Sequence, residues 1–146
     1  MGSISKQLFF SAPIEKVWKI WTDVEKTSEW VDGVQESKLT SSQKEGKGVS
    51  WEEKCLLAGK KLIQMNHSFV EWEDKKRTVT ETGLPMGASM QTTAEFKNKG
   101  DQTEATINLE WDLGIVGAMM GDDKTQHIME KSLNATAEKW KARAES

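Results

Sequence analysis

A run of alternating segments followed by one amphipathic helix is the feature that most constrains how this chain folds. From Val34 to Leu113, apolar and polar residues alternate in short segments separated by turn residues, which is typical of an antiparallel meander. The last segment alternates most cleanly, so one face of that strand is expected to pack while the other faces water. Its apolar positions are Ala105, Ile107, Leu109, Trp111 and Leu113.

The C-terminal segment predicts a long helix that reaches about Arg143. Five apolar residues fall within a narrow arc at 100° per residue, so they form one stripe along the helix. A helix of about 18 residues spans roughly 27 Å, which is long enough to cross a sheet. The stripe consists of Met129, Leu133, Ala137, Trp140 and Ala144.

Two starting points are open for this helix. It can begin as early as Ile115, which would place Asp122 and Gln126 on its sheet-facing stripe among apolar residues. Alternatively, Gly121 interrupts the helix and Asp122 caps a new start, because glycine followed by aspartate is a common helix beginning.

The N-terminal region predicts a strand from Ser3 to Phe10, followed by two short helices. Pro13 suits the first turn of a helix, where its missing N–H would be unpaired anyway. Together with six strands of the meander, these elements predict an α+β fold in a single domain covering residues 1–146. The first short helix packs through Ile14, Val17, Trp18 and Trp21, and the second runs from about Asp23 to Trp30.

Composition and charge argue against several classes of protein. The net charge is −3 with both signs interspersed, so the chain lacks the basic stripe that nucleic acid binding requires. No segment approaches the roughly 20 apolar residues of a membrane span, and no signal peptide is visible, so we expect a cytoplasmic protein. A monomer or weak homodimer is expected. Cys55 is the only cysteine, which rules out an internal disulfide and predicts an inert thiol.

The segment from Ser11 to Asp23, running on through Trp30, resembles the opening of the polyketide cyclase/dehydrase family. Its sharpest part is the Ala-Pro-x-x-x-Val-Trp pattern beginning at Ala12. That family belongs to the START-related helix-grip superfamily (SRPBCC), which also contains the birch-pollen allergens. The resemblance implies a curved antiparallel sheet of about seven strands around the C-terminal helix, with a cavity between them. In this superfamily the cavity binds lipids, sterols, polyketides or hormones, and a minority of members are enzymes.

Seven tryptophans and seven methionines either fill the core or form the wall of such a cavity. Both residue types make broad, adaptable apolar surfaces. No cofactor is expected. The predicted wall is Trp51, Met65, His67, Met90, Trp111, Met119, Gln126, Met129 and Leu133, and the predicted mouth is formed by Leu84, Met86 and Met120.

The polar candidates leave more than one interpretation open. His67 shares a strand face with apolar neighbours, so it points inward, either as a hydrogen-bonded core residue or as an acid–base catalyst with Glu53 or Glu81. Glu53 is either a buried acid or a charge at the strand edge. His127 is predicted to face solvent, so the two histidines do not converge and no metal site is expected.

These patterns favour binding or transport of a hydrophobic small molecule, such as a lipid or polyketide, in the internal cavity. One alternative is a cyclase or dehydratase acting on a polyketide-like substrate. The other is a protein-interaction domain like that of the Hsp90 ATPase activator, which begins with a similar motif.

Overall fold

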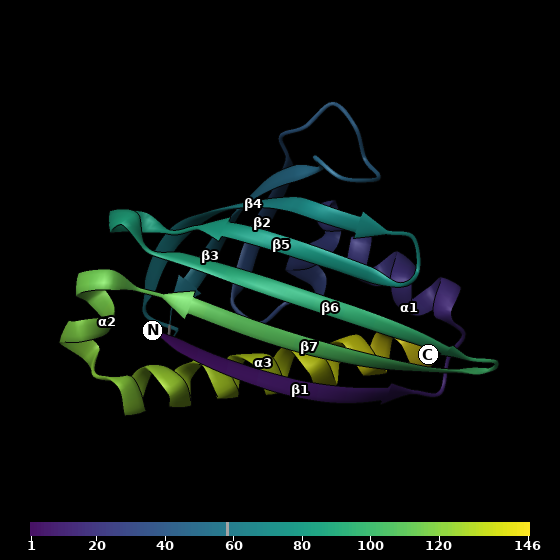
Figure 1. The fold of residues 1–146 in the computed structure, drawn as a ribbon. Helices are drawn as coiled ribbons and strands as arrows, with labels where there is room; N and C mark the ends of the chain where they lie inside the picture. The colour runs from purple at the N-terminus through teal and green to yellow at the C-terminus, as the bar shows by residue number, and fades with distance from the viewer. Residues whose placement is uncertain (58) are drawn as a thin grey trace.

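Across residues 1–57 and 59–146, which the computed structural model describes, seven strands form one antiparallel sheet that curves around a long helix (Figure 1). The spatial order is β1-β7-β6-β5-β4-β3-β2, so the first strand lies beside the last. The fold is therefore the helix-grip arrangement that the sequence predicts. The strands are β1 (Gly2–Phe10), β2 (Val34–Leu39), β3 (Ser50–Leu57), β4 (Lys61–Glu73), β5 (Arg77–Gly83), β6 (Ser89–Lys99) and β7 (Gln102–Asp112).

Five helical segments complete the described part of the chain. Two short ones follow β1, as expected, and the longest lies along the inner side of the sheet near β1 (Figure 1). Among these helices, none combines the length and apolar character needed to cross a bilayer. They are α1 (Ile14–Thr22), η1 (Val24–Glu29), η2 (Pro85–Gly87), α2 (Gly114–Met120) and α3 (Asp122–Glu145).

Gly121 decides where the long helix begins. Its φ of 87° and ψ of 150° lie outside the helical region, in a conformation that suits glycine because it has no Cβ. Helix α2 therefore ends at Met120 and α3 starts anew at Asp122. Asp122 is exposed in the first turn of α3, so it does not lie on a stripe facing the sheet.

Two strands of the sheet each lose their regular register at one point. A shift between Phe69 and Glu71 in the pairing of β4 with β5 marks an irregularity of the β-bulge type. A second shift lies between Val34 and Glu36 in β2. Bulges increase local twist and bend a strand, which helps the sheet to curve around α3.

The core centres on Trp140 of α3, which is 1% exposed. Its ring lies 4.8 Å from that of Phe10 and stacks on Trp21 at 4.9 Å, with Trp30 at 5.5 Å. This aromatic cluster joins β1, α1, the segment after η1 and the C-terminal half of α3. The predicted stripe of α3 is confirmed, because Leu133, Ala137, Trp140 and Ala144 are buried and Met129 is half-buried.

Replacing Trp140 with alanine is expected to lower the free energy of unfolding by about 3–5 kcal/mol, because it removes the centre of the aromatic cluster. Urea denaturation followed by circular dichroism measures this loss. Lys141→Ala is the control: the side chain is exposed on the next position of the same helix, and its effect should stay within about 0.5 kcal/mol. Equal effects of the two substitutions would contradict this account of the core.

Candidate functional site

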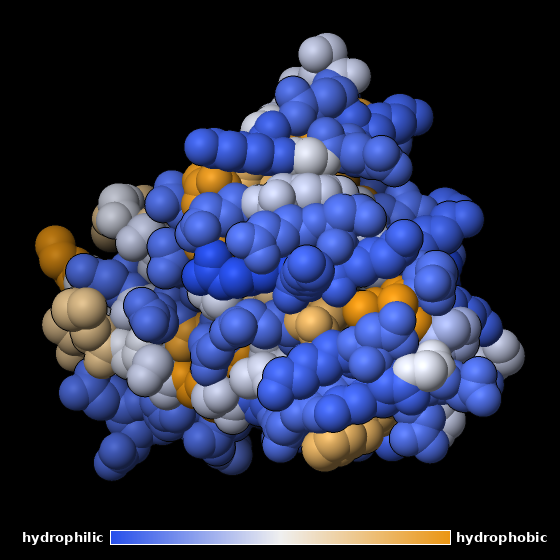
Figure 2. Space-filling view, turned by 45° about the vertical axis from the view of Figure 1, so that its right-hand side comes forward, coloured by the Kyte–Doolittle hydropathy of each residue, from blue (hydrophilic) through white to orange (hydrophobic). Residues whose placement is uncertain are grey.

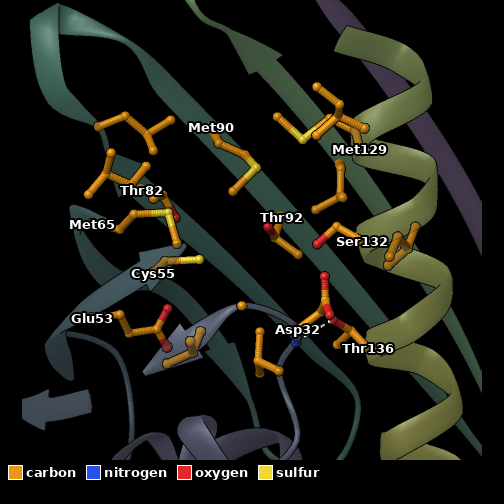
Figure 3. Close-up of a pocket in the computed structure, with 18 of the residues that line it drawn as sticks. Asp32, Glu53, Cys55, Met65, Thr82, Met90, Thr92, Met129, Ser132 and Thr136 are labelled. Atoms are coloured by element: carbon orange, nitrogen blue, oxygen red, sulfur yellow. Dashed lines mark hydrogen bonds between the residues drawn. The ribbon is translucent and has the colours of Figure 1, made fainter. Parts of the chain in front are cut away.

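A cavity of about 710 Å³ lies between the inner face of the sheet and the N-terminal half of α3. Its volume falls within the range typical of small-molecule binding sites. The wall is mostly apolar, and Figure 3 shows Met65, Met90 and Met129 directed into the same space from the sheet and from α3. Trp21, Trp30 and Trp140 also border the cavity, so the aromatic cluster forms one of its boundaries.

A row of inward-facing residues crosses four neighbouring strands. Trp51 of β3 pairs with His67 of β4, His67 pairs with Thr82 of β5, and Thr82 pairs with Met90 of β6. Directly paired residues in an antiparallel sheet project from the same face, so all four reach the cavity wall. The indole of Trp51 stacks on the imidazole of His67 with ring centroids 5.0 Å apart.

A hydrogen-bonded network is set into this apolar wall. The carboxylate of Glu53, which is 4% exposed, lies with Oε1 2.7 Å from Nε2 of His67. Nδ1 of His67 lies 2.7 Å from Oγ1 of Thr82. The second carboxylate oxygen accepts hydrogen bonds from the Thr27 hydroxyl at 2.6 Å and from Nε1 of Trp51 at 3.1 Å.

Glu53 remains a carboxylate because its partners outweigh its burial. Burial raises the pKa of Glu53, but the hydrogen bond and charge of His67, together with hydrogen bonds from Thr27 and Trp51, bring the pKa below its ordinary value. A carboxylate can only accept hydrogen bonds, so Nε2 of His67 carries the proton shared with Glu53. Of the two interpretations that the sequence leaves open, the buried acid is the one observed.

The network forms a chain of hydroxyl, imidazole and carboxylate along which a proton could move. Both ring nitrogens of His67 and both oxygens of Glu53 already have partners within the protein. A substrate could therefore reach a nitrogen of His67 only by displacing Glu53 or Thr82. The arrangement supports a role in holding the wall together and in orienting Thr82.

Sequence reasoning missed two members of this network. Thr82 could have been found, because its cross-strand pairing with His67 follows once the register of β4 and β5 is known. Thr27 lies in the short helix η1 and gives no periodic signal of contact with β3.

The structure places many of the candidate residues around the cavity. Leu84, Met86 and Met120 of the predicted mouth border it where η2 and α2 lie, and Met86 is 74% exposed there. Of the predicted wall residues, those that border it are Trp51, Met65, His67, Met90, Met129 and Leu133.

Three residues predicted for the wall lie elsewhere, so the prediction is wrong for them. Trp111 covers Gly2, its partner on β1, so closely that no Cβ would fit there, and it is absent from the cavity wall. Met119 is 81% exposed on α2, because the break at Gly121 turns that helix away from the stripe of α3. Gln126 donates from Nε2 to the carbonyl oxygen of Ser3 at 3.2 Å instead of facing the cavity.

Two other polar candidates, Glu81 and His127, do not take part in the network around His67. Glu81 is exposed, since it alternates along β5 with the inward-facing Thr82. His127 is exposed as well, although it borders the cavity from α3. Within residues 1–57 and 59–146, no three His, Cys, Asp or Glu side chains gather as a metal site would require.

The sequence matches the family described as polyketide cyclase/dehydrase and lipid transport over residues 1–145. The chain belongs to this family. Among curated proteins, none matches the sequence. Membership of this family and the START-like fold support a hydrophobic ligand-binding domain.

Solved structures of low sequence identity share the fold of this family member. A protein from Thermus thermophilus has 19% identity and a TM-score of 0.80, with 98% of this chain and 97% of that chain covered. A START superfamily protein from Mycobacterium smegmatis has 12% identity and a TM-score of 0.78, with 97% and 96% covered. The Zhui aromatase/cyclase from Streptomcyes sp. R1128 has 13% identity and a TM-score of 0.73, with 99% and 96% covered.

Glu53→Gln is expected to lower the free energy of unfolding at neutral pH by about 1–3 kcal/mol, because the amide group cannot accept all the hydrogen bonds that the carboxylate accepts. The pKa of Glu53 is lowered from 4.5 by folding, so its ionised form stabilises the protein above pH 4.5. That stabilisation is lost as the pH falls from 4.5 through the lower folded-state pKa. The difference between wild type and variant should therefore shrink in this window.

Urea denaturation at a series of pH values measures this difference. Glu52→Gln is the control, because Glu52 is the adjacent residue of β3 and projects from the opposite face. A difference between wild type and Glu53→Gln that stays constant down to pH 3 would contradict the network described here.

The thiol of Cys55 is expected to react slowly in the folded protein. Burial, followed by the charges of Glu53 and Asp32, raises the pKa of Cys55 from 9.0 to about 11. At pH 8 its reactive thiolate should be roughly 100-fold scarcer than that of an ordinary cysteine. Labelling with Ellman's reagent should be at least tenfold slower than for glutathione and should accelerate in urea. Rapid labelling of the folded protein would contradict the buried environment described for Cys55.

Proposed function

We propose that this protein binds a hydrophobic small molecule, such as a lipid or polyketide, inside the cavity and carries it. The observation that supports this is the open volume of about 710 Å³ beside an aromatic cluster that could have filled it. The family description, which includes lipid transport, agrees with the proposal.

The wall chemistry supports an apolar guest. Burying one methylene group contributes about 0.8 kcal/mol, so ten of them contribute roughly 8 kcal/mol before the cost of immobilising the ligand. Met65, Met90 and Met129 have flexible, polarizable side chains that adapt to ligands of different outline. Affinity therefore comes mainly from apolar contact.

Exposed apolar residues near the mouth give such a molecule a path into the cavity. Met86 in η2, and Ile115 and Met119 in α2, are 74%, 69% and 81% exposed. Figure 2 shows apolar side chains at its left-hand end, the side on which Figure 1 places η2 and α2. Gly87, the last residue of η2, and Gly121, directly after α2, adopt positive φ values. An apolar rim lets a ligand leave another apolar environment without full exposure to water.

A second candidate is an enzyme of the cyclase or dehydratase type, which the chain from Thr82 through His67 to Glu53 favours. If this candidate is correct, His67→Gln abolishes turnover of a bound polyketide while leaving its affinity within about threefold. Equal turnover by the wild type and the His67→Gln variant would rule out this enzymatic function.

The cavity should bind a neutral apolar dye, and filling the cavity should prevent this. N-phenyl-1-naphthylamine is expected to fluoresce on binding to the wild type, and Met129→Trp should weaken that binding at least tenfold, because the indole occupies cavity space. Ile63→Trp, from the opposite wall, is a second filling variant. Fluorescence titration and native mass spectrometry for a retained lipid-like mass are the measurements.

Lys124→Trp is the matched control, since Lys124 is exposed on the same helix and lies outside the cavity wall. It should bind the dye as the wild type does. Failure of the wild type to bind the dye or to retain any apolar mass would overturn the proposed function.

A further inference from the structure

The inner face of β5 carries a stripe of threonines where an apolar cavity would be served equally well by valine. Thr78, Thr80 and Thr82 project inward in succession, and Thr92 of β6 pairs directly with Thr80. Valine has nearly the shape of threonine, so the difference between the two is the hydroxyl group. The stripe therefore places hydroxyls where packing alone does not require them.

Two of these four hydroxyls have protein partners. Thr78 Oγ1 accepts a hydrogen bond from Nε1 of Trp21 at 2.9 Å. Thr82 Oγ1 is bound to His67 in the network described above. These two threonines are explained by contacts within the protein.

The other two hydroxyls have no protein partner among the described residues. Thr80 is 5% exposed and Thr92 is 9% exposed, and both border the cavity. Within residues 1–57 and 59–146, the Oγ atom of Ser37 is the one side-chain oxygen that is both inaccessible to solvent and without a hydrogen bond. The side-chain oxygens of Thr80 and Thr92 do not belong to this class, so they are accessible. The oxygens of Thr80 and Thr92 are therefore open to the cavity. A buried hydroxyl without a partner is unfavourable, so a water molecule or a ligand must supply its hydrogen bond.

A third hydroxyl approaches from the helix side. Ser132 of α3 borders the cavity, and its side chain takes part in no hydrogen bond within the described chain. Figure 3 shows the oxygens of Thr92 and Ser132 directed into the same space from the sheet and from the helix. A ligand lying between sheet and helix would meet hydroxyls on both sides.

The charges around the cavity decide which oxygen group fits. Glu53 on the sheet side is a buried carboxylate, and the carboxylate of Asp32 borders the cavity near Ser132 (Figure 3). The Nζ atom of Lys139 lies 3.9 Å from Oδ1 of Asp32, so the lysine partly offsets the charge of this carboxylate. Lys61 and Lys131, which border the cavity, are both exposed. An anionic ligand placed centrally would face these carboxylates, while the imidazole of His67 at the wall is already paired with Glu53.

We propose that the ligand is a neutral apolar molecule with a hydroxyl or carbonyl oxygen in its middle part, bound between Thr80 and Thr92 on one side and Ser132 on the other. This inference rests on the proposed function and adds the class of ligand. It distinguishes hydroxylated or keto ring compounds and mid-chain alcohols from fatty acids.

Three pyrene probes of matched size test it by fluorescence anisotropy with the full chain. 1-Hydroxypyrene should bind the wild type roughly three- to tenfold more tightly than 1-methylpyrene, as one or two hydrogen bonds allow. Pyrene-1-carboxylate should bind most weakly. Thr92→Val and Ser132→Ala should each reduce the preference for the hydroxyl probe towards onefold without weakening binding of the methyl probe.

Thr93→Val is the matched control, because Thr93 neighbours Thr92 on β6 and projects from the opposite face, away from the cavity wall. It should keep the wild-type preference. Equal binding of the hydroxyl and methyl probes, tightest binding of the carboxylate, or an unchanged preference in both Thr92→Val and Ser132→Ala would each overturn the inference while leaving the binding function intact. Absence of binding by all three probes would instead contradict the binding function itself.

Discussion

The packing of Trp140 into the aromatic cluster determines how the helix sits in the sheet. Trp140 contacts Phe10, Trp21 and Trp30, so the C-terminal half of α3 lies in close contact with β1 and α1. The N-terminal half presents Met129 and Ser132 to the cavity instead of to a packed neighbour. Large rigid rings at one end hold the helix at a distance that smaller side chains at the other end do not fill. The cavity is thus a consequence of uneven packing along one helix.

The buried network around Glu53 is the main polar feature set into this apolar wall. A charged carboxylate in a poorly hydrated site is unfavourable unless its oxygens accept hydrogen bonds. Here His67, Thr27 and Trp51 supply them from β4, η1 and β3. The network therefore links η1 to β3 and adds side-chain hydrogen bonds between β3, β4 and β5, which already pair through their backbones. It contrasts with the hydroxyls of Thr80 and Thr92, which no protein group satisfies in the described chain.

The fold was predictable because its signals are local and periodic. Alternation along β7 and the stripe of α3 each follow from burial on one face, and both are observed. The wall was predicted less completely, because alternation gives the face of a residue and not its neighbours in space. Trp111 has the expected burial but lies over Gly2, a pairing between the first and last strands that no local pattern reveals. The prediction for Met119 depended on whether Gly121 interrupts the helix. The small and flexible residues around Gly121 do not decide this from sequence alone.

The position of β1 has a consequence for how the chain reaches this structure during synthesis. β1 pairs along its length with β7, so it is synthesised well before the strand that supplies its hydrogen bonds. Until then Ile4, Leu8 and Phe10 lack their packing partners, and contacts between distant parts of a sequence form slowly. The cavity can close only after β7 and α3 have been synthesised, so a shorter nascent fragment has neither the completed sheet nor the cavity.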